Sequence, residues 1–249
     1  MRRPIQLTEN GREMKMLLDV EALPTGLPIS ESTSIRRPRG WLARLFHRAR
    51  RPAAQPHTLE SHLRLAVQLE LERSGAERTK CILLTSASSE TLIHEAGGEL
   101  AYAIASEMGR RVLLIDTNAN NTAARRGVTE LLAHGIGDLL ESAQPTEHER
   151  LFSLPTGSPS LVPAALSSGR HQELIEASCR LFDTVILLGG PIMKDPKWLV
   201  FAPFVDHALL LTVEGRTYMT DLDASLQALA ECKAARVSVV LLPARHTKS

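Results

Sequence analysis

The sequence predicts a doubly wound α/β fold, with a mostly parallel sheet flanked by helices. Short apolar runs alternate with helical patterns from residue 81 onward. The apolar runs lack the period of two that marks a half-exposed strand, so they suit strands buried on both faces. Strands and helices that alternate along the chain are typical of a parallel sheet covered by helices.

Six strands and the helices between them are expected. The strands are expected at residues 81–86, 112–116, 151–154, 184–188, 207–213 and 236–242. The helices are expected near 93–108, 127–142, 169–181, 195–203 and 219–233, with a further amphipathic helix at 58–73. Gly189, Gly190 and Pro191 follow the fourth strand, where they fit either a flexible binding loop or a tight turn.

The chain divides into a flexible, arginine-rich N-terminal arm, residues 1–56, and an α/β domain, residues 57–249. Six prolines and little periodicity predict that the arm is largely unstructured. Residues 34–52 hold seven arginines and no acid, whereas residues 53–249 carry a net charge of −5. The mildly acidic body gives no reason to expect nucleic-acid binding.

A basic amphipathic segment lies within the arm. Wound as a helix, it would place Trp41, Leu45 and Phe46 on one face. Arg44 and Arg48 would lie away from that face. The segment fits a solvated linker, a helix on an anionic membrane surface, or a docking peptide for a partner protein.

The compartment follows from what the sequence lacks. No apolar run approaches the ~20 residues that cross a bilayer, and the first residues precede no apolar signal region. Cys81, Cys179 and Cys232 are scattered, which favours buried free thiols over disulfides or metal ligands. We therefore expect a cytoplasmic protein.

The segment from 81 to 116 has the element order of a P-loop protein: a strand, a polar turn, an alanine-rich helix and a second strand. A P-loop needs glycines, which let backbone N–H groups point at phosphates, and a lysine, which neutralises their charge. Between Ser86 and Gly97 there is neither glycine nor lysine. The order predicts a phosphate-binding fold, while the residues argue against ordinary phosphate chemistry.

Seven short segments follow one another in an order that is typical of one family. Ile82–Ala87 reads like the motif I-L-V-T-S-A, and Val112–Asp116 reads like V-L-L-I-D. The other five are residues 127–132, 154–157, 163–168, 182–186 and 202–206. The chain from about 58 to 243 thus resembles the cytoplasmic domain of bacterial tyrosine kinases (BY-kinases) of capsule and exopolysaccharide synthesis. These belong to the MinD/ParA-like group of P-loop proteins.

The departures from the family affect the residues that handle ATP. Against the family's P-G-E-G-K-S-T loop, the lysine position falls on Ile93 and the magnesium-binding hydroxyl on His94. The acid expected at the end of a later strand is Leu188, whereas Asp116 keeps its acid and Asn118 alters the D-x-D pattern. The resemblance, read with these departures, implies no catalytic residue, no metal ligand and no obligatory cofactor.

A weak, degenerate site for ATP or another anion remains. Its predicted members are Ser88, Ser89, Thr91, Asp116 and Asn118. The hydroxyls precede a helix start, whose partial positive charge favours anions, but Glu90 competes for the same field. Asp116 also fits a structural acid at a strand end, and His94 fits a solvent-facing residue better than a ligand.

The leading hypothesis is a pseudoenzyme that serves as a regulatory or scaffolding subunit in exopolysaccharide or capsule biosynthesis and export. The resemblance implies as partners a membrane chain-length determinant protein, a related kinase or a glycosyltransferase. The basic arm would hold the protein peripherally at the inner membrane. Two alternatives stay open: a deviant ATP-binding switch that uses Asp116, and a MinD/ParA-like positioning adaptor.

Overall fold

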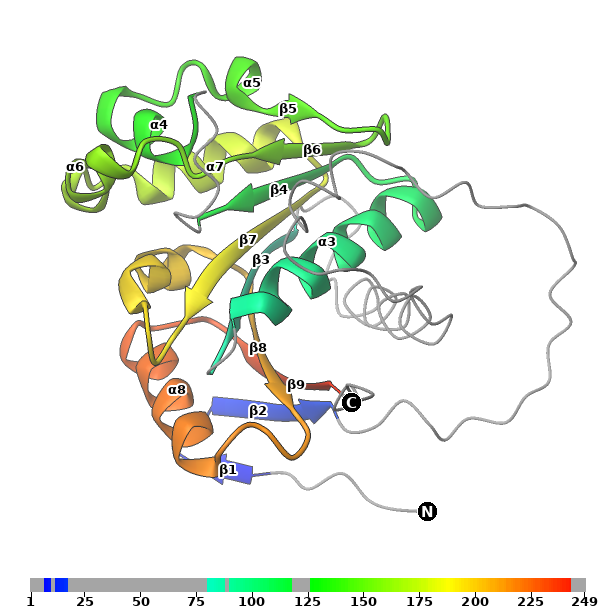
Figure 1. Ribbon diagram of the computed structural model, residues 1–249, viewed down its shortest axis with the longest axis vertical. Coiled ribbons are helices and arrows are strands. Elements are labelled where there is room, and N and C mark those ends of the chain that lie inside the picture. Colours follow the sequence, from blue (N-terminus) through cyan, green and yellow to red (C-terminus); the bar gives the residue numbers. More distant parts are fainter. Residues whose placement is uncertain (1–6, 10–11, 18–79, 88–89, 118–125, 243–249) are drawn as a thin grey trace, which may run out of the picture.

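The computed structural model describes residues 7–9, 12–17, 80–87, 90–117 and 126–242 (Figure 1). Within these residues the strands form one sheet in the order β1-β2-β9-β8-β3-β7-β4-β6-β5. The strands are β1 (Leu7–Glu9), β2 (Arg12–Leu17), β3 (Lys80–Ser86), β4 (Val112–Asp116), β5 (Gln144–Pro145), β6 (Leu151–Leu154), β7 (Thr184–Pro191), β8 (His207–Val213) and β9 (Val237–Leu242). Pairing is parallel from β2 to β6, and β1 and β5 add antiparallel edges. The predicted fold class is confirmed.

The four central strands, β3, β4, β7 and β8, are buried along their whole length. Successive side chains of a strand point to opposite faces, so each central strand contributes to two cores. Along β3, Ile82 and Leu84 belong to one apolar cluster, while Cys81 and Leu83 belong to the other. The uninterrupted apolar runs of the sequence therefore reflect burial on both faces.

Helices supply the second half of each core. Helix α3 (Glu90–Glu107) packs its Ile93, Leu100 and Ile104 on one face and runs across β3 and β7 in Figure 1. The elements that contribute to the opposite cluster are α4 (Val128–His134), α5 (Leu139–Ser142), α6 (Val162–Ser167), α7 (His171–Leu181), the 3-10 helix η2 (Pro196–Phe204) and α8 (Met219–Glu231). A short 3-10 turn, η1 (Pro159–Leu161), precedes α6.

Three helical predictions need correction. The helix expected at 127–142 is two helices, because Gly135 has a φ of 131°, which a residue with a side chain rarely adopts. No helix was expected at 162–167, where α6 forms a separate element before α7, the helix expected near 169–181. The helix expected at 195–203 is the 3-10 helix η2, which contains Pro203.

Strands β1 and β2 lie inside the segment that was predicted to be unstructured, so that prediction is wrong for residues 7–9 and 12–17. β2 pairs in parallel with β9, with Lys15 opposite Ser238 and Leu17 opposite Val240. Without β2, strand β9 would leave backbone N–H and C=O groups unpaired along its outer edge. The short, mixed composition of β1 and β2 gave no strand pattern to recognise.

Other predictions fall outside the described residues. These are the helix at 58–73, the boundary at 56/57, and the arm residues Trp41, Arg44, Leu45, Phe46 and Arg48. None of the three cysteines forms a disulfide, and the prediction of buried thiols holds for Cys81 alone, because Cys179 and Cys232 are half-buried. In the described part of the chain, no helix has the length and apolar character needed to span a bilayer.

Candidate functional site

The candidate site lies where β3, β7 and β4 end, at the carboxyl edge of the sheet. β7 is the middle strand of the three, so Leu188 stands between the end of β3 and Asp116 of β4. Of the five predicted site residues, only the Asp116 side chain is described. Ser88, Ser89 and Asn118 lie outside the described residues, and for Thr91 the structure gives the helical backbone alone.

Two apolar side chains occupy the positions at which the resemblance places charged groups. In the gapless reading of the family motifs Ile93 falls at the loop lysine and Leu188 at the strand-end acid, and each side chain is about 1% exposed. Both belong to the apolar cluster that includes Leu84. Leu188 also lies against Gly97 of α3: a β-carbon added there would stand 2.2 Å from Leu188 Cδ2. The two departures are thus parts of one packed core.

The glycines after Leu188 belong to strand β7, which extends to Pro191. Both alternatives predicted for these residues, a flexible binding loop and a tight turn, are therefore wrong. Leu84 pairs with Leu188 and Ser86 with Pro191, so β7 carries an extra residue there, as in a β-bulge. The Thr85 hydroxyl donates a 2.7 Å hydrogen bond to the Gly190 carbonyl, and the Ile192 N–H donates to the Ser86 carbonyl at 2.8 Å. These bonds tie β7 to the end of β3.

Asp116 is fully buried and faces a histidine. The carboxylate oxygen Oδ2 lies 3.8 Å from Nδ1 of His94, whose side chain is 20% exposed. That separation exceeds a hydrogen bond but lies within the reach of an ion pair. His94 therefore points at the strand end, which the expectation of a solvent-facing residue missed. No sequence pattern linked the two residues.

Hydrogen bonds fix the backbone around Asp116. The Thr156 hydroxyl donates to the Asp116 carbonyl at 2.9 Å. The hydroxyl and the N–H of Thr117 both donate to the Leu188 carbonyl, at 2.5 and 3.2 Å. Asp116, Thr117 and Thr156 are all buried. These bonds link the buried end of β4 to β7 and to the turn after β6.

Glu130 joins two of the segments that carry the resemblance, the start of α4 and the turn after β6. Its carboxylate accepts hydrogen bonds from the Gly127 N–H at 2.9 Å and the Ser158 N–H at 2.8 Å. Partial burial opposes ionisation, but the hydrogen bonds that the carboxylate accepts from backbone N–H groups and from the Thr129 hydroxyl together outweigh it, so the pKa of Glu130 is lowered from its ordinary value. Gly157 has a φ of +90°, and a β-carbon there would stand 1.9 Å from Glu130 Oε2. Gly157 therefore leaves the space in which the Glu130 carboxylate joins the two segments.

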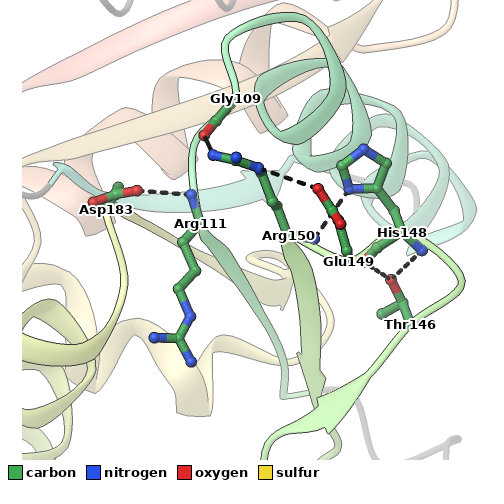
Figure 2. Close-up of polar contacts among 7 residues, drawn as sticks. All are labelled: Gly109, Arg111, Thr146, His148, Glu149, Arg150 and Asp183. Atoms are coloured by element: carbon green, nitrogen blue, oxygen red, sulfur yellow. Dashed lines mark hydrogen bonds and ion pairs between the residues drawn. The ribbon is translucent and has the colours of Figure 1, made fainter.

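A second group of polar contacts lies at the opposite end of the sheet, before β4, β6 and β7 (Figure 2). The Arg111 N–H donates to Asp183 Oδ2 at 2.8 Å, and the Arg111 guanidinium lies over the rings of two phenylalanines. The Arg150 guanidinium donates to the Gly109 carbonyl, just after α3. Most of these bonds involve backbone groups, so the cluster joins strand starts. Among the described residues, no group of three His, Cys, Asp or Glu side chains is arranged to hold a metal ion.

Comparisons with solved structures show what this arrangement of elements is similar to. The kinase domain of Escherichia coli tyrosine kinase ETK matches with a TM-score of 0.65 and 19% identity, over 77% of this chain and 78% of that chain. The VpsO kinase domain matches with a TM-score of 0.63 and 19% identity, over 76% of this chain and 95% of that chain. MinD from Pyrococcus horikoshii, complexed with Mg-ADP, matches with a TM-score of 0.52 and 18% identity, over 69% of this chain and 72% of that chain.

The sequence comparisons give no match. No protein-family model matches the chain, and no curated protein matches it either. Likenesses at these identities establish the fold. The chain therefore has the P-loop NTPase-like fold that is shared by these tyrosine kinase domains and MinD.

Proposed function

We propose that this chain is a catalytically inactive relative of bacterial tyrosine kinases, which serves as a regulatory or scaffolding subunit in exopolysaccharide or capsule biosynthesis. The observation that carries the proposal is the burial of Ile93 and Leu188 in one apolar cluster. At these positions a phosphoryl-transfer site of this fold needs a cation and an acid. Here the two side chains complete the packing of α3 on the sheet.

The missing groups have a calculable effect on nucleotide affinity. A hydrogen bond to a charged group contributes about 1.5–3 kcal/mol, so losing the loop lysine and the magnesium-binding hydroxyl removes about 3–6 kcal/mol. That loss weakens binding roughly 10²- to 10⁴-fold. A nucleotide site with a Kd of about 1 μM would become a site in the ~0.1–10 mM range.

The partners follow from the resemblance and from the charge of the chain. A membrane chain-length determinant, a related active kinase or a glycosyltransferase would bind the α/β body. Segment 34–52, with its seven arginines, would hold the protein at the anionic cytoplasmic face of the inner membrane. Trp41, Leu45 and Phe46 would enter the interface while Arg44 and Arg48 contact headgroups.

Calorimetric titration of Mg-ATP and Mg-ADP into the full chain tests the proposal. We expect no heat and no thermal shift at nucleotide concentrations up to about 10 μM, well below the ~0.1–10 mM range of Kd worked out above. MinD of Pyrococcus horikoshii, whose structure holds Mg-ADP, is the positive control. Micromolar binding would overturn the proposal.

One observation favours a second function, a deviant nucleotide switch. Asp116 keeps the acid of the resemblance, and His94 brings an imidazole within 3.8 Å of it. If nucleotide binds through this pair, Asp116→Asn should abolish binding while Glu95→Gln, one residue beyond His94, should leave it unchanged. Loss in both variants, or in neither, would refute a role for Asp116.

The likeness to MinD supports a third function, a positioning adaptor. Localisation of a fluorescent fusion separates this function from the first. A positioning adaptor should concentrate at a pole or division site, whereas a polysaccharide subunit should follow its membrane partner.

A further inference from the structure

We propose that Tyr218 is an acceptor site for phosphoryl transfer from an active tyrosine kinase. The inference rests on the proposed function, in which a related active kinase is one of the partners. The chain has only two tyrosines, Tyr102 and Tyr218, and the surroundings of their side chains differ.

Tyr218 stands in an exposed stretch between β8 and α8. Its side chain is 74% exposed and that of Met219 is 66% exposed. On its amino-terminal side residues 214–216 are exposed, and on its carboxyl-terminal side residues 219 and 220 are exposed. A kinase must take the tyrosine and its neighbours into its own active site. Tyr218 offers both without any unfolding of the body.

The backbone around Tyr218 is held from both sides. The Val213 carbonyl accepts from the N–H groups of Arg216 and Thr217, at 3.1 and 3.0 Å. The Tyr218 carbonyl accepts from Asp221 and Leu222, at 3.1 and 3.0 Å. Tyr218 itself is extended, with φ −74° and ψ 143°, ahead of the first turn of α8. An extended residue on a fixed turn presents its side chain outward at little entropic cost.

Tyr102 lacks these properties. It lies within α3, between Ala101 and Ala103, which are both fully buried. Its ring packs edge-on against His148, with 5.6 Å between the ring centroids. A kinase could reach the Tyr102 hydroxyl with its flanking residues only if α3 left the sheet. Tyr102 is therefore a matched internal control.

The reaction is an ordinary phosphoryl transfer from ATP bound to the partner kinase. The Tyr218 Oη atom attacks the γ-phosphorus, and a new O–P bond forms. The bond between the γ-phosphorus and the β,γ-bridging oxygen breaks, ADP leaves, and the phenolic proton passes to a base of the kinase. The product carries a charge of about −1.5 to −2 at the start of α8, where the helix dipole favours an anion.

The test uses the full chain, Mg-ATP and, as the probe enzyme, the ETK kinase domain, which matches this chain with a TM-score of 0.65. Trypsin releases Tyr218 in peptide 217–233 and Tyr102 in peptide 81–110, so mass spectrometry assigns the modification. We expect kinase-dependent phosphorylation of peptide 217–233, lost in Tyr218→Phe and retained in Tyr102→Phe. Both peptides should be modified when the chain is unfolded in mild denaturant that leaves the kinase active.

Three outcomes separate the inference from the proposed function. If the kinase phosphorylates itself but not Tyr218, or modifies Thr217 or Thr220 instead, the inference is wrong and the proposed function stands. If Tyr218 is phosphorylated without added kinase, the acceptor site is supported and the proposed lack of catalysis is refuted. Equal labelling of Tyr102 and Tyr218 in the folded chain would also refute the structural argument.

Discussion

Replacing Gly97 by alanine should destabilise the protein, and the same replacement should stabilise a variant that already carries Leu188→Ala. An alanine β-carbon at position 97 would stand 2.2 Å from Leu188 Cδ2 and 3.1 Å from Leu84 Cδ2. The first contact requires a real displacement, because Leu188 is buried against α3. Removing the Leu188 side chain removes that contact and leaves space that the new methyl group can fill.

The expected free energies follow from these contacts. Overpacking a core costs about 1–3 kcal/mol, while alanine in place of a helical glycine gains about 0.5–1 kcal/mol. Gly97→Ala alone should therefore lower the free energy of unfolding by about 0.5–2 kcal/mol. Leu188→Ala alone should lower it by about 2–5 kcal/mol through cavity formation. In the double variant Gly97→Ala should gain about 0.5–1 kcal/mol, so the coupling energy is about 1–3 kcal/mol.

Urea unfolding of the four proteins, followed by far-UV circular dichroism, measures this coupling. Gly137→Ala is the matched control, because a β-carbon there would have nothing within 4 Å. It should combine additively with Leu188→Ala, within about 0.5 kcal/mol. Additivity of Gly97→Ala with Leu188→Ala would falsify the claim that Leu188 packs directly on α3 at the position of the strand-end acid.

Three further predictions concern charge. Because the pKa of Glu130 is lowered, its stabilisation is present above the ordinary carboxyl range and is lost as the pH falls through the folded pKa. In urea unfolding at a series of pH values, Glu130→Gln should cost about 1–3 kcal/mol at pH 7 and progressively less as the pH falls below the ordinary carboxyl pKa. Burial lowers the pKa of His171, so the unfolded chain takes up this proton at a higher pH than the folded chain does. The free energy of unfolding should therefore fall as the pH drops below about 6.5. His171→Leu should flatten this part of the curve of unfolding free energy against pH, and an unchanged slope would contradict the reasoning. Arg44→Ala with Arg48→Ala should weaken co-sedimentation with phosphatidylserine vesicles by about 2 kcal/mol, roughly 30-fold, and leave phosphatidylcholine vesicles unaffected.

The central sheet was predictable because its strands are buried on both faces. The expected bounds at 112–116, 151–154 and 207–213 agree with β4, β6 and β8 residue for residue. Prediction failed where local signals compete with pairing. Gly189 and Gly190 read as a turn, yet hydrogen bonds to β3 continue β7 through them.

For the candidate site, the sequence indicated which charged residues of the family motifs this chain lacks, but not how the side chains at those positions pack. Ile93 and Leu188 are 95 positions apart in the chain, and nothing in either local pattern indicates that they share one cluster. The approach of His94 to Asp116 likewise depends on how α3 lies across the sheet. Such contacts are tertiary, so a linear pattern does not contain them.

The shared burial of Ile93 and Leu188 also limits which substitutions this chain can accept at these two positions during evolution. An aspartate at 188 alone would bury a carboxylate among Leu84 and Ile93, and an uncompensated buried charge costs several kcal/mol. A lysine at 93 alone would meet the same penalty. Leu188→Asp is tolerable only after Ile93→Lys, and Ile93→Lys only after Leu188→Asp, so neither substitution can be selected first. In a lineage that once carried both charges, their loss is therefore hard to reverse by single substitutions. Later substitutions are then expected on the surface, where they alter which partners bind.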